Sequence, residues 1–318
     1  MLLILIKMMP LVLMTVVGYL LNRLKIISID FNRQLSLTLI NVFYPCMIIN
    51  LMVSNFTPRT LLECWSMPAG LIFILCTGWT AGLLTRGLLR KQREETRRCY
   101  HFSCMMNNYS FLPIMMAASM WGERAVALII FSALGSELSI WTLGIKTLTG
   151  DKLSLRSLRH LLSMPMLALT AAFIIIFIRA ALVQNGITLS TGVGEISNQL
   201  METCKFISGA TIPVSAIICG SRMASMKAAH VLNPLVAGTC LMRLVLIPTF
   251  CVICFMFLPL ETDIRRVLIL IAVQPAAMGS VMLAEAYQAD AAFAAVITFA
   301  THILCLFSIP LWLSLLLP

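Results

Sequence analysis

The chain has 318 residues, of which 60% are hydrophobic and only 11% are charged, whereas a soluble domain is about half apolar and about one quarter charged. This composition excludes a soluble enzyme or binding domain of useful size and indicates an all-α polytopic membrane protein. The formal net charge of +10 does not indicate a nucleic-acid partner. The basic residues lie in short loops between apolar segments, where membrane topology and contact with the anionic lipids of the bilayer explain them.

Ten apolar segments are long enough to cross a bilayer, which takes about 20 residues for each helix. We expect these spans at residues 3–22, 35–54, 65–87, 100–120, 124–147, 162–183, 198–220, 232–257, 265–287 and 291–316. Together they form a single transmembrane domain over residues 1–318. The first segment lacks a small-residue cleavage site and Lys7 interrupts its start, so we interpret it as a mature helix and not as a signal peptide.

The fourth span contains a polar run that ends just before a proline. The residues concerned are Asn107, Asn108, Tyr109, Ser110 and Pro113. Proline lacks a backbone donor and clashes with the turn that precedes it, so a continuous helix is disfavoured here. Broken backbone at membrane depth is tolerated where it is buried in protein or lines a cavity.

The ninth span contains a second interruption, which includes Gln274, Pro275 and Ser280. Paired interruptions at corresponding places in two halves are typical of the binding site of a transporter. Where two half-helices begin, their free N–H groups and partial positive charge attract an anion without a fixed cation. We therefore expect substrate binding by Asn107, Asn108, Tyr109, Ser110, Pro113, Gln274, Pro275 and Ser280. The alternative is a pair of ordinary proline kinks whose polar side chains hold helices together.

The two halves of the chain also correspond to one another. When the first half is shifted by 166 residues, Pro113 falls near Pro275 and Pro45 falls near Pro213. The two units cover residues 1–148 and 162–318, and each holds five spans. Because five is an odd number, the second unit must enter the membrane from the opposite face, which predicts an inverted repeat.

The distribution of Lys and Arg predicts the orientation, because cytoplasmic loops carry an excess of both. With both termini outside, fifteen of these residues lie inside and seven outside. Those inside are Arg23, Lys25, Arg33, Arg86, Arg90, Lys91, Arg93, Arg97, Arg98, Lys146, Lys152, Arg156, Arg159, Arg222 and Lys227. Those outside are Lys7, Arg59, Arg124, Arg179, Lys205, Arg265 and Arg266. We therefore predict that both termini face the non-cytoplasmic side.

Four ionisable residues within the predicted spans are singled out as candidates for a functional role. Glu137, Arg243 and His302 are expected near the membrane midplane, and Glu285 nearer the inside end of the ninth span. Such groups usually face the protein interior and are paired, so Glu137 and Arg243 are predicted to pair with each other. This pair would be a static brace, a proton-coupling element or a direct contact for a substrate carboxylate. His302 is either a packed, hydrogen-bonded side chain or a group that titrates near neutral pH.

Sequence motifs give no indication of a cofactor or a metal. Most of the eleven cysteines fall within apolar spans, where cysteine behaves as a small hydrophobic residue. Cys251 and Cys254 form a CxxC motif without a neighbouring histidine or second pair. The chain also lacks HExxH, paired aspartates and a phosphate-binding GxxxxGK[ST] loop. We therefore expect neither an enzyme nor an ATP-driven pump.

Several stretches resemble bacterial members of the auxin efflux carrier family, which include malonate and organic-anion permeases. The fourth span resembles theirs at NYSFLPI (108–114) and WGERA (121–125), the fifth at LGSE (134–137) and WTLG (141–144), and the ninth at QPAAM (274–278) and LAEAY (283–287). The sequence departs from the family where Ser110 stands for a frequent glycine and Met115 for a proline.

This resemblance implies ten helices in two inverted five-helix repeats, with helices four and nine crossed at their breaks. Helices three to five and eight to ten would move as a transport domain. Helices one, two, six and seven would form a scaffold that also makes a homodimer. The implied substrate is a small organic anion, such as malonate or malate. A sodium-coupled carrier of the bile-acid type and a non-transporting membrane sensor remain as alternatives.

Overall fold

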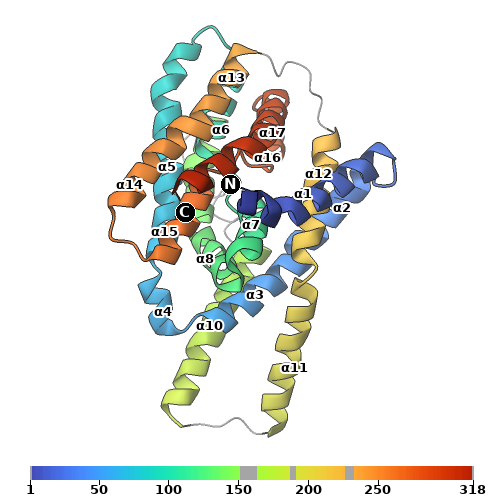
Figure 1. Ribbon diagram of the computed structural model, residues 1–318, viewed down its shortest axis with the longest axis vertical. Coiled ribbons are helices and arrows are strands. Elements are labelled where there is room, and N and C mark those ends of the chain that lie inside the picture. Colours follow the sequence, from blue (N-terminus) through green and yellow to red (C-terminus); the bar gives the residue numbers. More distant parts are fainter. Residues whose placement is uncertain (1, 151–162, 187–190, 226–232, 317–318) are drawn as a thin grey trace.

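The computed structural model describes residues 2–150, 163–186, 191–225 and 233–316, and within these ranges the regular structure is helical throughout (Figure 1). The first half contains α1 (Leu2–Arg23), α2 (Ile29–Thr38), α3 (Tyr44–Asn55), α4 (Pro58–Glu63), α5 (Ser66–Arg86), α6 (Glu94–Met105), α7 (Phe111–Trp121), α8 (Glu123–Ser139) and α9 (Ile145–Thr149). The second half contains α10 (Met164–Gln184), α11 (Thr191–Ser208), α12 (Thr211–Ser225), α13 (Pro234–Leu241), α14 (Ile247–Phe257), α15 (Thr262–Ala272), α16 (Ser280–Ala286) and α17 (Ala291–Leu316).

Seven helical segments in the described ranges are long and apolar enough to cross a membrane. Each of the ten expected spans falls on helical structure. The fourth span consists of two half-helices, α6 and α7, and the ninth span consists of α15 and α16. Both predicted interruptions are therefore confirmed. Four of the residues counted for the orientation, Lys152, Arg156, Arg159 and Lys227, lie outside the described residues.

The seventh span differs from the prediction in length and continuity. Helical structure extends from α11 through α12 and is interrupted at Gly209 and Ala210. Pro213 lies in the first turn of α12 and has no N–H to donate to the carbonyl of Gly209, which explains the interruption. The α11 helix begins at Thr191, before the predicted start at residue 198. Its first turns contain polar residues, which the hydropathy pattern does not mark.

Three long segments contain one wide π-helical turn each, at Leu39–Phe43, Ile140–Gly144 and Met242–Leu246. Pro45 and Pro248 follow the first and third of these turns. A proline ring clashes with the carbonyl four residues earlier in a regular helix, and a widened turn removes that clash. These helices therefore continue past their prolines without ending.

The helices pack in two groups, and α7 contacts helices of both. In one group α1 packs along α12, and α3 lies against α10 and α11. In the other, α5 packs against α6 and α8, α14 against α15, and α17 against α16 and α13. A large hydrophobic core joins the two groups, partly through the contact between α3 and α8.

Candidate functional site

The two interrupted segments meet at their breaks. The backbone N–H of Asn108 donates to the carbonyl oxygen of Pro275 at 2.8 Å, and the N–H of Ala277 donates to the carbonyl oxygen of Met106 at 3.1 Å. These bonds form a short antiparallel bridge between residues that are far apart in the sequence. The extended backbone at the breaks is thus paired inside the protein, as membrane depth requires.

A cavity of about 200 Å³ adjoins this bridge. Five of the predicted binding residues line it: Asn107, Asn108, Tyr109, Ser110 and Ser280. Pro113, Gln274 and Pro275 do not line it. Most of the remaining wall is apolar and comes from α7, α12, α16 and the π-helical turn Leu39–Phe43, while α2 adds the polar Ser36. The cavity therefore presents a few polar groups within a hydrophobic surface, an arrangement typical of small-molecule sites.

Asn108 links this cavity to His302 on α17. The amide nitrogen of Asn108 lies 3.4 Å from Nε2 of His302, and Nδ1 of His302 lies 2.8 Å from the carbonyl oxygen of Thr298. When Nδ1 donates to that carbonyl, Nε2 carries the lone pair and accepts from Asn108. His302 is thus a buried, hydrogen-bonded side chain that orients the Asn108 amide, and it also lines a second, apolar cavity of about 350 Å³.

The side chains of Asn107 and Gln274 donate hydrogen bonds to the C-terminal end of α15. Asn107 donates through Nδ2 to the carbonyl oxygen of Ile271 at 2.6 Å, and Gln274 donates through Nε2 to that of Leu270 at 2.9 Å. Both carbonyls lie in the last turn of α15, where helical acceptors lack partners within the helix. Their amide nitrogens therefore stabilise the break.

Two serines at the breaks differ in their hydrogen bonding. Ser110 donates from Oγ to the hydroxyl of Tyr44 at 3.3 Å. The Ser280 side chain is only 1% exposed, and its hydroxyl has no hydrogen-bond partner within the described part of the chain. A buried hydroxyl without a partner is rare and costs about 1–3 kcal/mol. Ser280 therefore offers the cavity a group that a ligand could satisfy.

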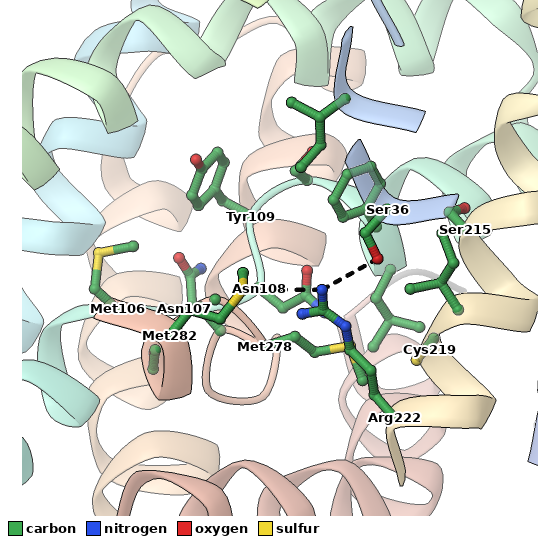
Figure 2. A pocket seen from close by; sticks show the side chains of 18 of the residues that line it. Ser36, Met106, Asn107, Asn108, Tyr109, Ser215, Cys219, Arg222, Met278 and Met282 are labelled. Atoms are coloured by element: carbon green, nitrogen blue, oxygen red, sulfur yellow. Dashed lines mark hydrogen bonds between the residues drawn. The ribbon is translucent and has the colours of Figure 1, made fainter. Parts of the chain in front are cut away.

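Arg222 brings a positive charge into the cavity, which the sequence analysis did not anticipate. It is half-buried near the end of α12, and its Nη2 donates to the hydroxyl of Ser36 at 3.1 Å. Figure 2 shows its guanidinium group extending toward Ser36 and the segment that carries Asn108. In the sequence this arginine follows an apolar span, where a basic residue ordinarily indicates only the orientation of the chain.

The predicted pairing of Glu137 with Arg243 is wrong. Arg243 donates instead to three backbone carbonyls, and Glu137 accepts a hydrogen bond from Nε1 of Trp141 at 2.8 Å. A guanidinium group has five donors and no acceptor, so carbonyl groups at the breaks satisfy it without a carboxylate. Glu285 is exposed near the end of α16.

A comparison with protein families finds a match over nearly the whole chain. The family described as membrane transport protein matches residues 3–155 and 152–313. The chain belongs to this family. The match supports the resemblance to auxin efflux carriers. No curated protein matches the chain.

Members of the membrane transport protein family are transporters and not enzymes. Together with the candidate spans, membership makes this chain a multi-pass membrane transporter. The cavity at the paired breaks is accordingly the candidate site for what it transports.

Proposed function

We propose that the protein is a secondary carrier that moves a small organic anion, such as a mono- or dicarboxylate, across the cytoplasmic membrane by alternating access. The observation that carries the proposal is that one cavity holds both a guanidinium group, on Arg222, and the two paired breaks. A fixed positive charge beside uncharged donors suits a carboxylate, because Arg binds carboxylates with directed hydrogen bonds.

The other polar groups of the cavity add to this preference. The α7 helix begins at the break, next to Ser110, so its N-terminal end contributes partial positive charge. Ser280 contributes an unpartnered hydroxyl, and Asn108 an amide that His302 orients. The cavity is smaller than the roughly 300–1,000 Å³ of sites for drug-sized ligands, which favours a small acid over a steroid.

The architecture that we propose has ten membrane-spanning helices in two inverted repeats, residues 1–148 and 162–318. The paired interruptions of α6–α7 and α15–α16 support it, because such pairs occur at the interface of inverted repeats. The two packing groups support a division into a scaffold and a moving domain. We also propose that both termini lie on the non-cytoplasmic side and that two copies of the chain form a homodimer through the scaffold helices.

Uptake of labelled malonate and malate into proteoliposomes tests this function. We expect saturable uptake by the parent protein, and Arg222→Gln should raise KM at least about tenfold through loss of a charged hydrogen bond. Arg59→Gln is the matched control, because Arg59 is exposed and pairs only with its neighbour Glu63 among the described residues.

Three outcomes would contradict the proposal. Folded protein that takes up no carboxylate would favour a sensor. Sodium-driven uptake of a steroid acid would favour a carrier of the bile-acid type. Equal effects of the Arg222 and Arg59 substitutions would remove Arg222 from the site.

A further inference from the structure

The two breaks leave carbonyl groups without their usual helical partners. In a continuous helix the carbonyls of Cys104 and Ala272 would accept from the N–H groups of Asn108 and Ala276. Here both of those N–H groups bond elsewhere, to a carbonyl across the break and to a threonine hydroxyl on α17. The C-terminal ends of α6 and α15 therefore present unfilled acceptors at the same place.

Arg243 fills these acceptors from a third helical segment. It donates through Nη1 to Cys104 at 3.1 Å, through Nη2 to Ala272 at 2.9 Å and through Nε to Gln274 at 3.2 Å. Its side chain is 0% exposed, and it lies in the π-helical turn Met242–Leu246. Such turns often occur at functional positions. One side chain thus joins both broken helices to a third.

The charges at this junction balance. Each helix C-terminus is equivalent to roughly −0.5 of an elementary charge, so the ends of α6 and α15 together contribute about −1. The guanidinium of Arg243 supplies +1 at the point where the two ends meet. In carriers with broken helices, half-helix C-terminal ends and unwound carbonyls are the groups that coordinate a coupling Na⁺.

We propose that Arg243 is a built-in cation that takes the place of a dissociable metal cation at the paired breaks, so that the breaks keep their geometry without Na⁺. Arg243 acts as a positioning residue, because it holds the backbone from which Asn108 and Ser280 reach the cavity. This inference rests on the proposed function only for the claim that the cavity binds substrate.

Thermal unfolding of the purified protein in detergent tests the inference without any substrate. The parent protein should have the same Tm in sodium chloride and in choline chloride. Arg243→Ala should lower Tm in choline, and millimolar guanidinium or methylguanidinium chloride should restore part of the loss by entering the vacated position. Arg243→Lys keeps the charge and should remain independent of sodium.

Arg265→Ala is the matched control, because Arg265 also donates to two backbone carbonyls, those of Phe255 and Leu258, away from the breaks. Its Tm should not respond specifically to guanidinium. In proteoliposomes, uptake by Arg243→Ala should fall at least about tenfold, the scale of one lost hydrogen bond to a charged group, and guanidinium should partly restore it.

If the Tm or the uptake rate of the parent protein were higher in sodium chloride than in choline chloride, the inference would be overturned, even if Arg243→Ala does not fold. An Arg243→Ala variant with the same Tm as the parent protein would also overturn it. Equal restoration of Tm by guanidinium in the Arg243 and Arg265 variants would have the same consequence. Loss of Tm with specific rescue would support the inference even if no carboxylate were transported, which separates it from the proposed function.

Discussion

At the scale of single residues, Asn108 has the most direct connection to the proposed substrate. Its backbone pairs the two breaks, and its side chain lies between the cavity and His302. The backbone bond survives a change of side chain, whereas the amide does not. Substitution of Asn108 therefore separates the binding role of the amide from the structural role of the break.

Asn108→Ala should weaken substrate binding roughly tenfold to a hundredfold, because it removes one or two hydrogen bonds to a charged group. Expression and Tm should stay close to those of the parent. Asn55→Ala serves as the control. Among the described residues, the Asn55 side chain donates a hydrogen bond only to the carbonyl oxygen of Leu51 in its own helix. Parental uptake kinetics for Asn108→Ala would show that this amide only packs helices.

The polar residues of the breaks could be predicted from the sequence because local chemistry marks them. Amides and hydroxyls beside a proline are conspicuous within an apolar span. The partners of Arg243 could not be predicted, because its acceptors are backbone carbonyls that become free only when two distant helices break. Arg222 could not be assigned to the cavity either, because an arginine at the end of a span is ordinarily a topology signal.

At the scale of helices, the crossing of α1 and α12 depends on two glycines. A Cβ atom on Gly220 would lie 1.8 Å from the carbonyl oxygen of Thr15, and one on Gly18 would lie 2.2 Å from that of Ile217. Small residues let membrane helices approach to backbone contact. Because α12 carries Arg222, this close crossing also fixes the depth at which the guanidinium enters the cavity.

Gly220→Ala should destabilise the protein by about 1–3 kcal/mol, the usual cost of forcing an extra group into a packed interior. Thermal unfolding in detergent measures the effect. Gly194→Ala on the neighbouring α11 provides the control, because a Cβ there meets nothing within 4 Å and alanine favours a helix more than glycine does. A Tm for Gly220→Ala as high as that of Gly194→Ala would mean that α1 shifts without cost.

The helical segments themselves were largely predictable, since apolar length marks them directly. The hydropathy pattern does not mark the interruption at Gly209 and Ala210, although Pro213 corresponds to Pro45. The same residue type has different outcomes at these two places. Before Pro45 a π-helical turn absorbs the clash, whereas before Pro213 the helix ends. Which outcome occurs depends on packing, which the local sequence does not specify.

At the scale of the whole molecule, the basic connection between α5 and α6 is the strongest indicator of orientation. Glu94 pairs there with Arg86 and Arg97, and Glu95 pairs with Arg93. These pairs reduce the net charge of the connection. The orientation rule counts Lys and Arg and gives acidic residues little weight, so the prediction that the basic residues of this connection face the cytoplasm is unchanged.

Two single-cysteine variants on a background without native cysteines test this orientation. The side chains of Arg93 and Arg59 are 80% and 88% exposed, so both substitutions leave an accessible thiol. In intact cells a membrane-impermeant maleimide should label Arg59→Cys, which lies on the predicted outer side. Arg93→Cys should react only after the membrane is permeabilised. Labelling of Arg93→Cys but not Arg59→Cys in intact cells would contradict the predicted orientation. Both termini would then lie inside, and Arg222 would meet the substrate from the opposite side of the membrane.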